Sequence, residues 1–173
     1  MSIAMENMLS RRSVRKYKSD MIPKEILDQI LKAGSYAATG RNLQSPIMIV
    51  VTNQELRNRL SAMNARIMGT DSDPFYGAPV VIIVLADRSV PTYVYDGSLV
   101  MGNLMLAAHE LGVGSCWIHR AREDFDSEEG KAILKELGIE GDYEGIGHCI
   151  LGYADGPLPA EKPRKENYIY YAE

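Results

Sequence analysis

The 173-residue sequence has only two cysteines, Cys116 and Cys149, which are too few for a disulfide framework. Its longest continuous apolar stretch, residues 79–86, has the length of a strand and is far short of the roughly 20 residues that cross a membrane. Charged residues interrupt the N-terminus before a signal-like apolar core could form. These absences predict a reduced, cytoplasmic protein with no membrane partner.

The sequence also lacks an excess of positive charge. It has 19 Lys and Arg against 23 Asp and Glu, a net charge of −4, which argues against a globally basic nucleic-acid binder. Hydrophobic residues make up 46% of the chain, enough to bury one core. We find no internal repeat or linker, so we expect residues 1–173 to form one domain.

Several catalytic motifs are absent. There is no phosphate-binding P-loop, no Gly-x-Ser-x-Gly elbow and no obvious pair of nucleophile and base. His148 and Cys149 invite a zinc interpretation together with Cys116 and His119, but neighbouring residues of a strand face opposite sides of a sheet. We therefore assign no metal ligand and no catalytic side chain, and expect a cofactor to perform any redox chemistry.

What is present is an alternation of helices and strands. Helical spacing predicts helices over residues 2–12, 23–38, 54–67 and 93–111 and a short one after Ser127, while β-branched runs predict strands over 47–52, 80–86 and 146–153. The helix 93–111 is apolar nearly all round, which is typical of a central or interface helix. A short return between strands near the end favours an α+β fold of three layers, α-β-α.

The first segment with chemical potential is the basic cluster, residues 11–18, which has five cations in eight residues. Arginine forks and a serine hydroxyl suit a phosphate, and Lys162, Arg164 and Lys165 could converge on the same anion. The alternative is a solvated face whose cations favour a helix C-terminus.

The second segment is the amide loop, residues 39–46. Asn42 and Gln44 offer paired donors and acceptors that match the edge of a planar heterocycle. The alternative is a polar turn that satisfies its own backbone. A third segment, Gly112-x-Gly114-Ser115, lets the backbone approach a ligand closely, but it is no dinucleotide fingerprint because its third glycine is missing.

In this order and at these separations, the segments resemble the FMN-dependent nitroreductase family. The family pattern Arg-Arg-Ser-x-Arg is similar to residues 11–15, and Ser/Thr-x-x-Asn-x-Gln followed by proline is similar to residues 39–46. The stretches 78–79, 111–118, 151–153 and 162–164 also resemble family members. The resemblance covers nearly the whole chain.

The resemblance implies a nitroreductase-like fold with a mainly antiparallel mixed sheet, and a homodimer with two FMN sites at the subunit interface. A tail of about residues 155–173 would wrap the partner, and Gly97 and Gly102 would permit close helix contact. The implied FMN-binding residues are Arg11, Arg12, Ser13, Arg15, Lys162 and Arg164 of one subunit, then Thr39, Asn42 and Gln44 of its partner, with Trp117, Ile118 and His119 at the hydride-accepting edge.

The implied activity is NAD(P)H-dependent reduction of nitroaromatics, quinones or similar small acceptors by a ping-pong, two-electron mechanism. Alternatives are a flavin-binding carrier or redox sensor without nicotinamide turnover, and a flavin enzyme of another type such as a reductive dehalogenase. Residues 69–77, with Phe75 and Tyr76, are either a lid or a surface turn that these two aromatics anchor.

Overall fold

The computed structural model describes residues 1–172. Its helices are α1 (Ile3–Ser10), α2 (Lys24–Ser35), α3 (Gln54–Met68), α4 (Tyr93–Glu110), α5 (Ala121–Asp126) and α6 (Glu128–Glu136), with a short 3₁₀ turn η1 (Gly40–Asn42). The strands are β1 (Pro46–Val51), β2 (Val80–Asp87), β3 (Gly114–Ile118) and β4 (Tyr143–Gly152). Among these residues, no helix is both long and apolar enough to span a membrane.

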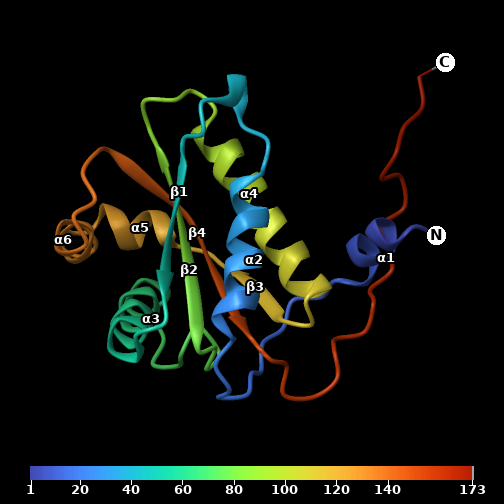
Figure 1. Ribbon diagram of the computed structural model, residues 1–173, viewed down its shortest axis with the longest axis horizontal. Coiled ribbons are helices and arrows are strands. Elements are labelled where there is room, and N and C mark those ends of the chain that lie inside the picture. Colours follow the sequence, from blue (N-terminus) through green and yellow to red (C-terminus); the bar gives the residue numbers. More distant parts are fainter. Residues whose placement is uncertain (173) are drawn as a thin grey trace.

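The four strands form one sheet in the order β1-β2-β4-β3, and every neighbouring pair is antiparallel. The parallel component that we predicted is reduced to an isolated bridge between Ser13 and Ser115. Helices α2 and α4 cover one face of the sheet and α3, α5 and α6 the other, as Figure 1 shows. The α+β, three-layer prediction is confirmed.

The alternation of β2 explains why both faces carry a core. Val80, Ile82, Val84 and Ala86 lie in the layer with α2 and α4, whereas Val81, Ile83 and Leu85 lie in the layer with α3, α5 and α6. All seven are fully buried, as expected for a central strand with a helix layer on each face.

Local signals fix most helix boundaries. The Asn53 side chain accepts a hydrogen bond from the Leu56 amide, and Ser127 caps α6 in the same way. At the end of α3, Gly69 adopts the left-handed conformation that terminates a helix. Helix α5, which is only six residues long, was not predicted from the sequence.

Candidate functional site

The basic cluster runs along the edge of the sheet. The Val14 amide donates to the Ser115 carbonyl and the Lys18 amide to the Tyr153 carbonyl, each at 2.9 Å. Val14 packs so closely on Gly114 that a Cβ there would lie 2.8 Å from a Val14 methyl carbon. The segment is therefore held against β3 and the end of β4, which fixes the backbone of Ser13. Arg15 is exposed on the same segment.

Arg11 and Arg12 differ in their partners. Arg11 Nη1 is buried and makes no hydrogen bond with any residue among 1–172. Arg12 instead donates from Nη1 to the carbonyls of Leu9 and Arg11, and its Nη2 lies 3.2 Å from Glu161 Oε2. Arg12 therefore caps the C-terminus of α1, as in the alternative interpretation of the basic cluster. Arg11, in contrast, has a buried nitrogen that donates no hydrogen bond to residues 1–172.

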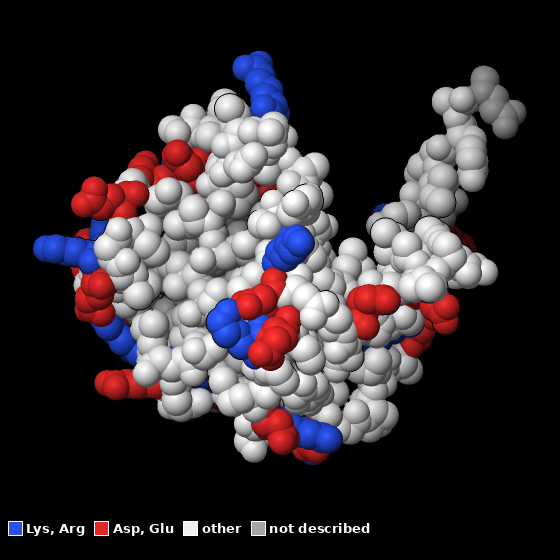
Figure 2. Space-filling model, in the orientation of Figure 1, with Lys and Arg blue, Asp and Glu red and all other residues white. Residues whose placement is uncertain are grey.

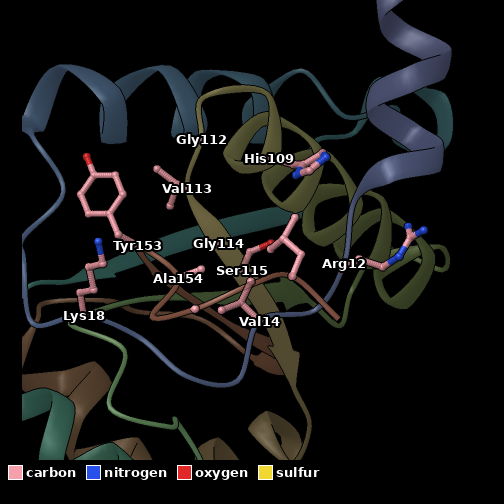
Figure 3. Close-up of a pocket in the computed structure, with 12 residues that line it drawn as sticks. Arg12, Val14, Lys18, His109, Gly112, Val113, Gly114, Ser115, Tyr153 and Ala154 are labelled. Atoms are coloured by element: carbon pink, nitrogen blue, oxygen red, sulfur yellow. The ribbon is translucent and has the colours of Figure 1, made fainter. Parts of the chain in front are cut away.

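A pocket of about 380 Å³ opens beside this cluster. Figure 3 shows that Arg12 and His109 lie at one side of it, with Lys18 and Tyr153 at the other and the Gly112–Ser115 segment between them. His109 makes a 2.8 Å hydrogen bond with Ser10 Oγ. Burial, and then the positive charge of Arg11, lower the pKa of His109. The pocket wall therefore has positive charge on arginine and lysine beside a largely neutral imidazole.

The amide loop is tied to the start of α4 by a buried carboxylate. Asp96 is 2% exposed and accepts hydrogen bonds from the Gly40 amide, Ser45 Oγ and Thr92 Oγ1, at 2.9, 2.9 and 3.0 Å. A Cβ at Gly40 would clash with Thr92 Oγ1. Asp96 thereby fixes both ends of the loop.

Within the loop, three residues other than glycine have a positive φ: Arg41, Asn42 and Gln44, at 53°, 56° and 50°. This left-handed conformation is costly for such residues and persists only where the surroundings hold it. Gln44 Nε2 donates to Asn42 Oδ1, and the Gln44 amide donates to Thr39 Oγ1, both at 3.2 Å. Asn42 and Gln44 are exposed, so their side-chain amides are accessible to a ligand or to a second subunit.

Strand β3 is the edge of the sheet next to the basic cluster. Because the Ser115 carbonyl points outward to Val14, the alternation of an antiparallel strand directs the Trp117 backbone groups to the same side. The Trp117 side chain packs in the α4 layer, and Ile118 packs in the opposite layer. His119 follows the strand with an exposed side chain, and its carbonyl accepts a 2.9 Å hydrogen bond from Asn64.

Lys162 and Arg164 are exposed on the tail that follows β4. The contact between Glu161 and Arg12 brings this tail to the end of α1, directly before Lys162. The tail then leaves the body of the subunit, as the red trace in Figure 1 shows.

The predicted residues form two groups at opposite ends of α4. The amide loop contacts Asp96 in the first turn, whereas Ser10, next to Arg11, contacts His109 in the last. Thirteen residues separate Asp96 from His109, which is about 20 Å along the axis. One subunit does not bring the two groups together.

Residues 69–77 are anchored by one carboxylate. Asp73 pairs with buried Arg57 and accepts from Ser61 Oγ and from the amides of Phe75 and Gly77. Although burial works against it, these hydrogen bonds lower the pKa of Asp73. Phe75 is fully buried, whereas Tyr76 is exposed. The segment is a surface turn that Asp73 and Phe75 hold, so only one of the two expected aromatics anchors it.

Sequence reasoning missed two features near the site. Asp96 could have been noticed, because it is the only acid before Glu110 in an otherwise apolar helix. The cluster of Asn64, Asp124 and His148 could not be predicted from a local sequence pattern, because its successive members are 60 and 24 residues apart. His148 and Cys149 do point to opposite faces: His148 packs on Phe75, and Cys149 lies in the α4 layer.

The model of the nitroreductase family matches residues 8–70 and 66–153. An Archaeoglobus fulgidus protein provisionally named NADH dehydrogenase/NAD(P)H nitroreductase is 29% identical over 100% of this chain and 92% of its own length. A Methanothermobacter thermautotrophicus protein of the same name is 33% identical over 122 residues, 65% of this chain and 59% of the relative.

Among solved structures, a nitroreductase with bound FMN from Bacteroides fragilis has a TM-score of 0.89 and 31% identity, with 100% of both chains covered. A family match over most of the chain and full-length structural agreement lead to one conclusion: the chain belongs to the nitroreductase family.

Proposed function

We propose that this protein is an FMN-dependent NAD(P)H oxidoreductase that acts as a homodimer. The observation that carries the proposal is the separation of the two predicted groups. The basic cluster, with the unpaired Arg11 Nη1, and the amide loop, with the exposed side chains of Asn42 and Gln44, lie at opposite ends of α4. Two subunits in antiparallel contact along α4 would place the basic cluster of one beside the amide loop of the other, twice per dimer.

The residues present fit FMN. Arg11 Nη1 is buried and has no hydrogen-bond partner among residues 1–172, and a phosphate oxygen of FMN would accept a charge-assisted hydrogen bond from it. Ser13, Lys162 and Arg164 would add contacts at that end, with Arg12 along the flavin and Arg15 near its pyrimidine edge. Thr39, Asn42 and Gln44 would come from the other subunit. The backbone of Trp117, Ile118 and His119 would line the edge that receives hydride. The bound FMN of the Bacteroides fragilis relative supports this assignment.

Exposed apolar surface supports the dimer. On α1, Ile3, Met8 and Leu9 are more than half exposed, and on α4 so is Tyr95. In the view of Figure 2, charged side chains gather at the left edge, at the bottom and in a mixed cluster near the centre, and the surface above that cluster is largely uncharged. Such a surface is typical of a subunit interface.

We further propose that residues 1–173 are one domain and that the tail, from about residue 155, wraps the partner. Leu158, Tyr168, Ile169, Tyr170 and Tyr171 are exposed in the single subunit. A second copy would supply the apolar surface that these side chains lack. The last residue of the proposed tail, 173, lies outside the described residues.

When bound, FMN supplies two-electron chemistry: hydride from NADH or NADPH, then electrons to a nitroaromatic, quinone or similar small acceptor, in ping-pong order. The side chains of this protein bind and orient. Arg15 would stabilise negative charge near the pyrimidine, and the β3 edge would keep the nicotinamide and the acceptor in one place. No side chain is assigned as an acid, so protons would come from water or substrate.

A visible spectrum of the freshly purified protein, recorded before and after anaerobic addition of NADH and then NADPH, tests this proposal. We expect a flavin spectrum that bleaches with one of the two donors. A flavin that stays oxidised with both would favour the carrier or redox-sensor alternative. Absence of flavin, even after reconstitution with FMN, would contradict the proposal.

A further inference from the structure

A cluster of polar side chains lies inside the apolar layer between the sheet and helices α3 and α5. Asn64, Asp124 and His148 come from α3, α5 and β4, and each is fully buried. Burying a polar group in such a layer costs free energy unless it is hydrogen-bonded. These three residues therefore call for a structural or functional reason.

The Asn64 amide makes three hydrogen bonds, all to one short segment. Its Nδ2 donates to the His119 carbonyl at 2.9 Å and to Asp124 Oδ2 at 2.8 Å, and its Oδ1 accepts from Arg120 Nε at 3.0 Å. Both donors of Asn64 are used, and all three hydrogen-bond partners lie within residues 119–124. The side chain thus clamps the turn that connects β3 to α5.

That turn has an unfavourable backbone conformation. Arg120, which precedes α5, has a φ of 74°, in the left-handed region that residues other than glycine seldom adopt. Because such a conformation is costly, the surrounding contacts must hold it. Asn64 holds it from both sides, through the carbonyl before Arg120 and through the Arg120 guanidinium.

Asp124, which accepts a hydrogen bond from Asn64, lies over His148 of strand β4. His148 Nε2 lies 3.4 Å from Asp124 Oδ2, the oxygen that accepts from Asn64. The His148 ring packs on Phe75 and Phe125, at centroid distances of 5.2 and 6.2 Å. Neither ring nitrogen of His148 makes a hydrogen bond among residues 1–172, so His148 supports Asp124 by packing alone, and Asp124 in turn accepts from the Asn64 amide.

We propose that Asn64 is a positioning residue of the flavin site, supported by Asp124 and His148. It acts through the backbone of Ile118–Arg120, whose first part was assigned above to the hydride-accepting edge of FMN. This inference rests on the proposed function, since it needs a flavin at that edge. The Asn64 side chain itself is fully buried, so its effect on the flavin would pass through this backbone.

The test replaces Asn64 with leucine, which has a similar size and no polar atoms. The matched control is Ser61→Ala on the same helix, which removes a hydrogen bond to Asp73 at the 69–77 turn instead. Amide hydrogen exchange of the flavin-free protein is measured over residues 118–124 and 69–77. The rate of anaerobic flavin reduction by the effective nicotinamide, and the FMN dissociation constant, are measured on the loaded protein.

We expect Asn64→Leu to speed exchange over 118–124 and to slow flavin reduction by about tenfold or more, because small misplacements of a reacting edge are costly. The FMN dissociation constant should change less, since the phosphate contacts lie at the basic cluster. Ser61→Ala should speed exchange only over 69–77 and leave the reduction rate unchanged. Asp124→Asn, which keeps an acceptor for Asn64, should stay close to wild type in both readouts.

Unchanged exchange over 118–124 in Asn64→Leu, or an equal loss of reduction rate in Ser61→Ala, would overturn the inference. If Asn64→Leu does not fold, Asn64→Ser replaces it, since its shorter side chain cannot reach both partners. If the wild type binds no FMN, the proposed function fails, and with it the flavin part of this inference. The exchange data would still decide whether Asn64 holds the turn.

Discussion

At the scale of single residues, Arg11 is the cation in the basic cluster with a buried nitrogen that no residue among 1–172 satisfies. We expect Arg11→Ala to purify colourless or to lose FMN readily. A hydrogen bond to a charged group contributes about 1.5–3 kcal/mol, so its loss should raise the FMN dissociation constant roughly ten- to hundredfold. Quenching of flavin fluorescence on titration into flavin-free protein measures this change.

The control for Arg11 is Arg59→Ala, which removes a surface arginine that pairs with Glu129 and Glu136 on the opposite helix layer. It should bind FMN as the wild type does. Wild-type affinity in Arg11→Ala would remove Arg11 from the proposed site.

Asp124 makes stability depend on pH. Burial raises its pKa from 3.8 to about 6, against the lowering effect of Asn64 and Arg120. The folded protein then binds this proton more tightly than the unfolded chain does. Protonation of Asp124 therefore adds to the free energy of unfolding below pH 4, and this contribution is lost as pH rises through about 6. Burial lowers the pKa of His148 to about 3, which acts in the opposite direction and is common to wild type and variant.

We therefore expect Asp124→Asn to gain about 1.4 kcal/mol of stability relative to wild type between pH 5 and pH 8, because about one pH unit of the titration lies above pH 5. Urea unfolding at both pH values measures the difference. Glu123, Arg120 and Arg66 also act on this carboxyl and are unchanged in the variant. The control is Asp73→Asn, because the pKa of Asp73 is lowered and its effect should be constant from pH 5 to 8. A constant difference for Asp124→Asn as well would show that its carboxyl does not titrate in this range.

At the scale of elements, the two glycines of α4 have different surroundings. A Cβ at Gly97 would lie 2.5 Å from Ile146 Cγ1, whereas a Cβ at Gly102 would meet nothing within 4 Å. The expectation that both glycines serve a partner helix is therefore wrong for Gly97, which permits α4 to approach β4 inside the subunit. Gly102 is free to serve the interface.

We expect Gly97→Ala to lower the melting temperature, because overpacking costs about 1–3 kcal/mol and exceeds the gain in helix propensity of about 1 kcal/mol. Gly102→Ala should keep the fold and weaken self-association. Thermal unfolding and sedimentation of both variants distinguish the two roles. Equal melting temperatures would contradict the packing argument, and unchanged association of Gly102→Ala would place this glycine outside the interface.

The order of helices and strands followed from local patterns. Caps at Asn53 and Ser127 and the helical stripes were readable because each depends on residues within one or two turns. The expected helix over residues 2–12 ends at Ser10, and the one over 23–38 ends at Ser35. The six-residue α5 was missed because one and a half turns show no periodicity.

At the scale of the whole molecule, the separation of the basic cluster from the amide loop predicts a dimer. Sedimentation should give a dimer that binds two FMN molecules. Removal of the tail after Asp155 should weaken both association and FMN binding, because Lys162 and Arg164 are lost with the apolar tail residues. A monomer with tightly bound FMN would contradict the shared site.

The sequence by itself determined the α+β class, the three candidate segments and the resemblance to nitroreductases. These depend on neighbouring residues or on motifs whose spacing is preserved along the chain. It also identified the segment with the unpaired Arg11 nitrogen and the segment with the exposed amides of Asn42 and Gln44.

Only the tertiary structure decided which residues meet. Asp96 holds the amide loop from 51 to 56 residues away, and Asn64 reaches His119 across 55 residues. It also separated Arg11, which has an unused donor, from Arg12, which caps α1. Such contacts arise where distant elements pack against one another, and no local pattern encodes them, because burial and distance are set by the whole fold.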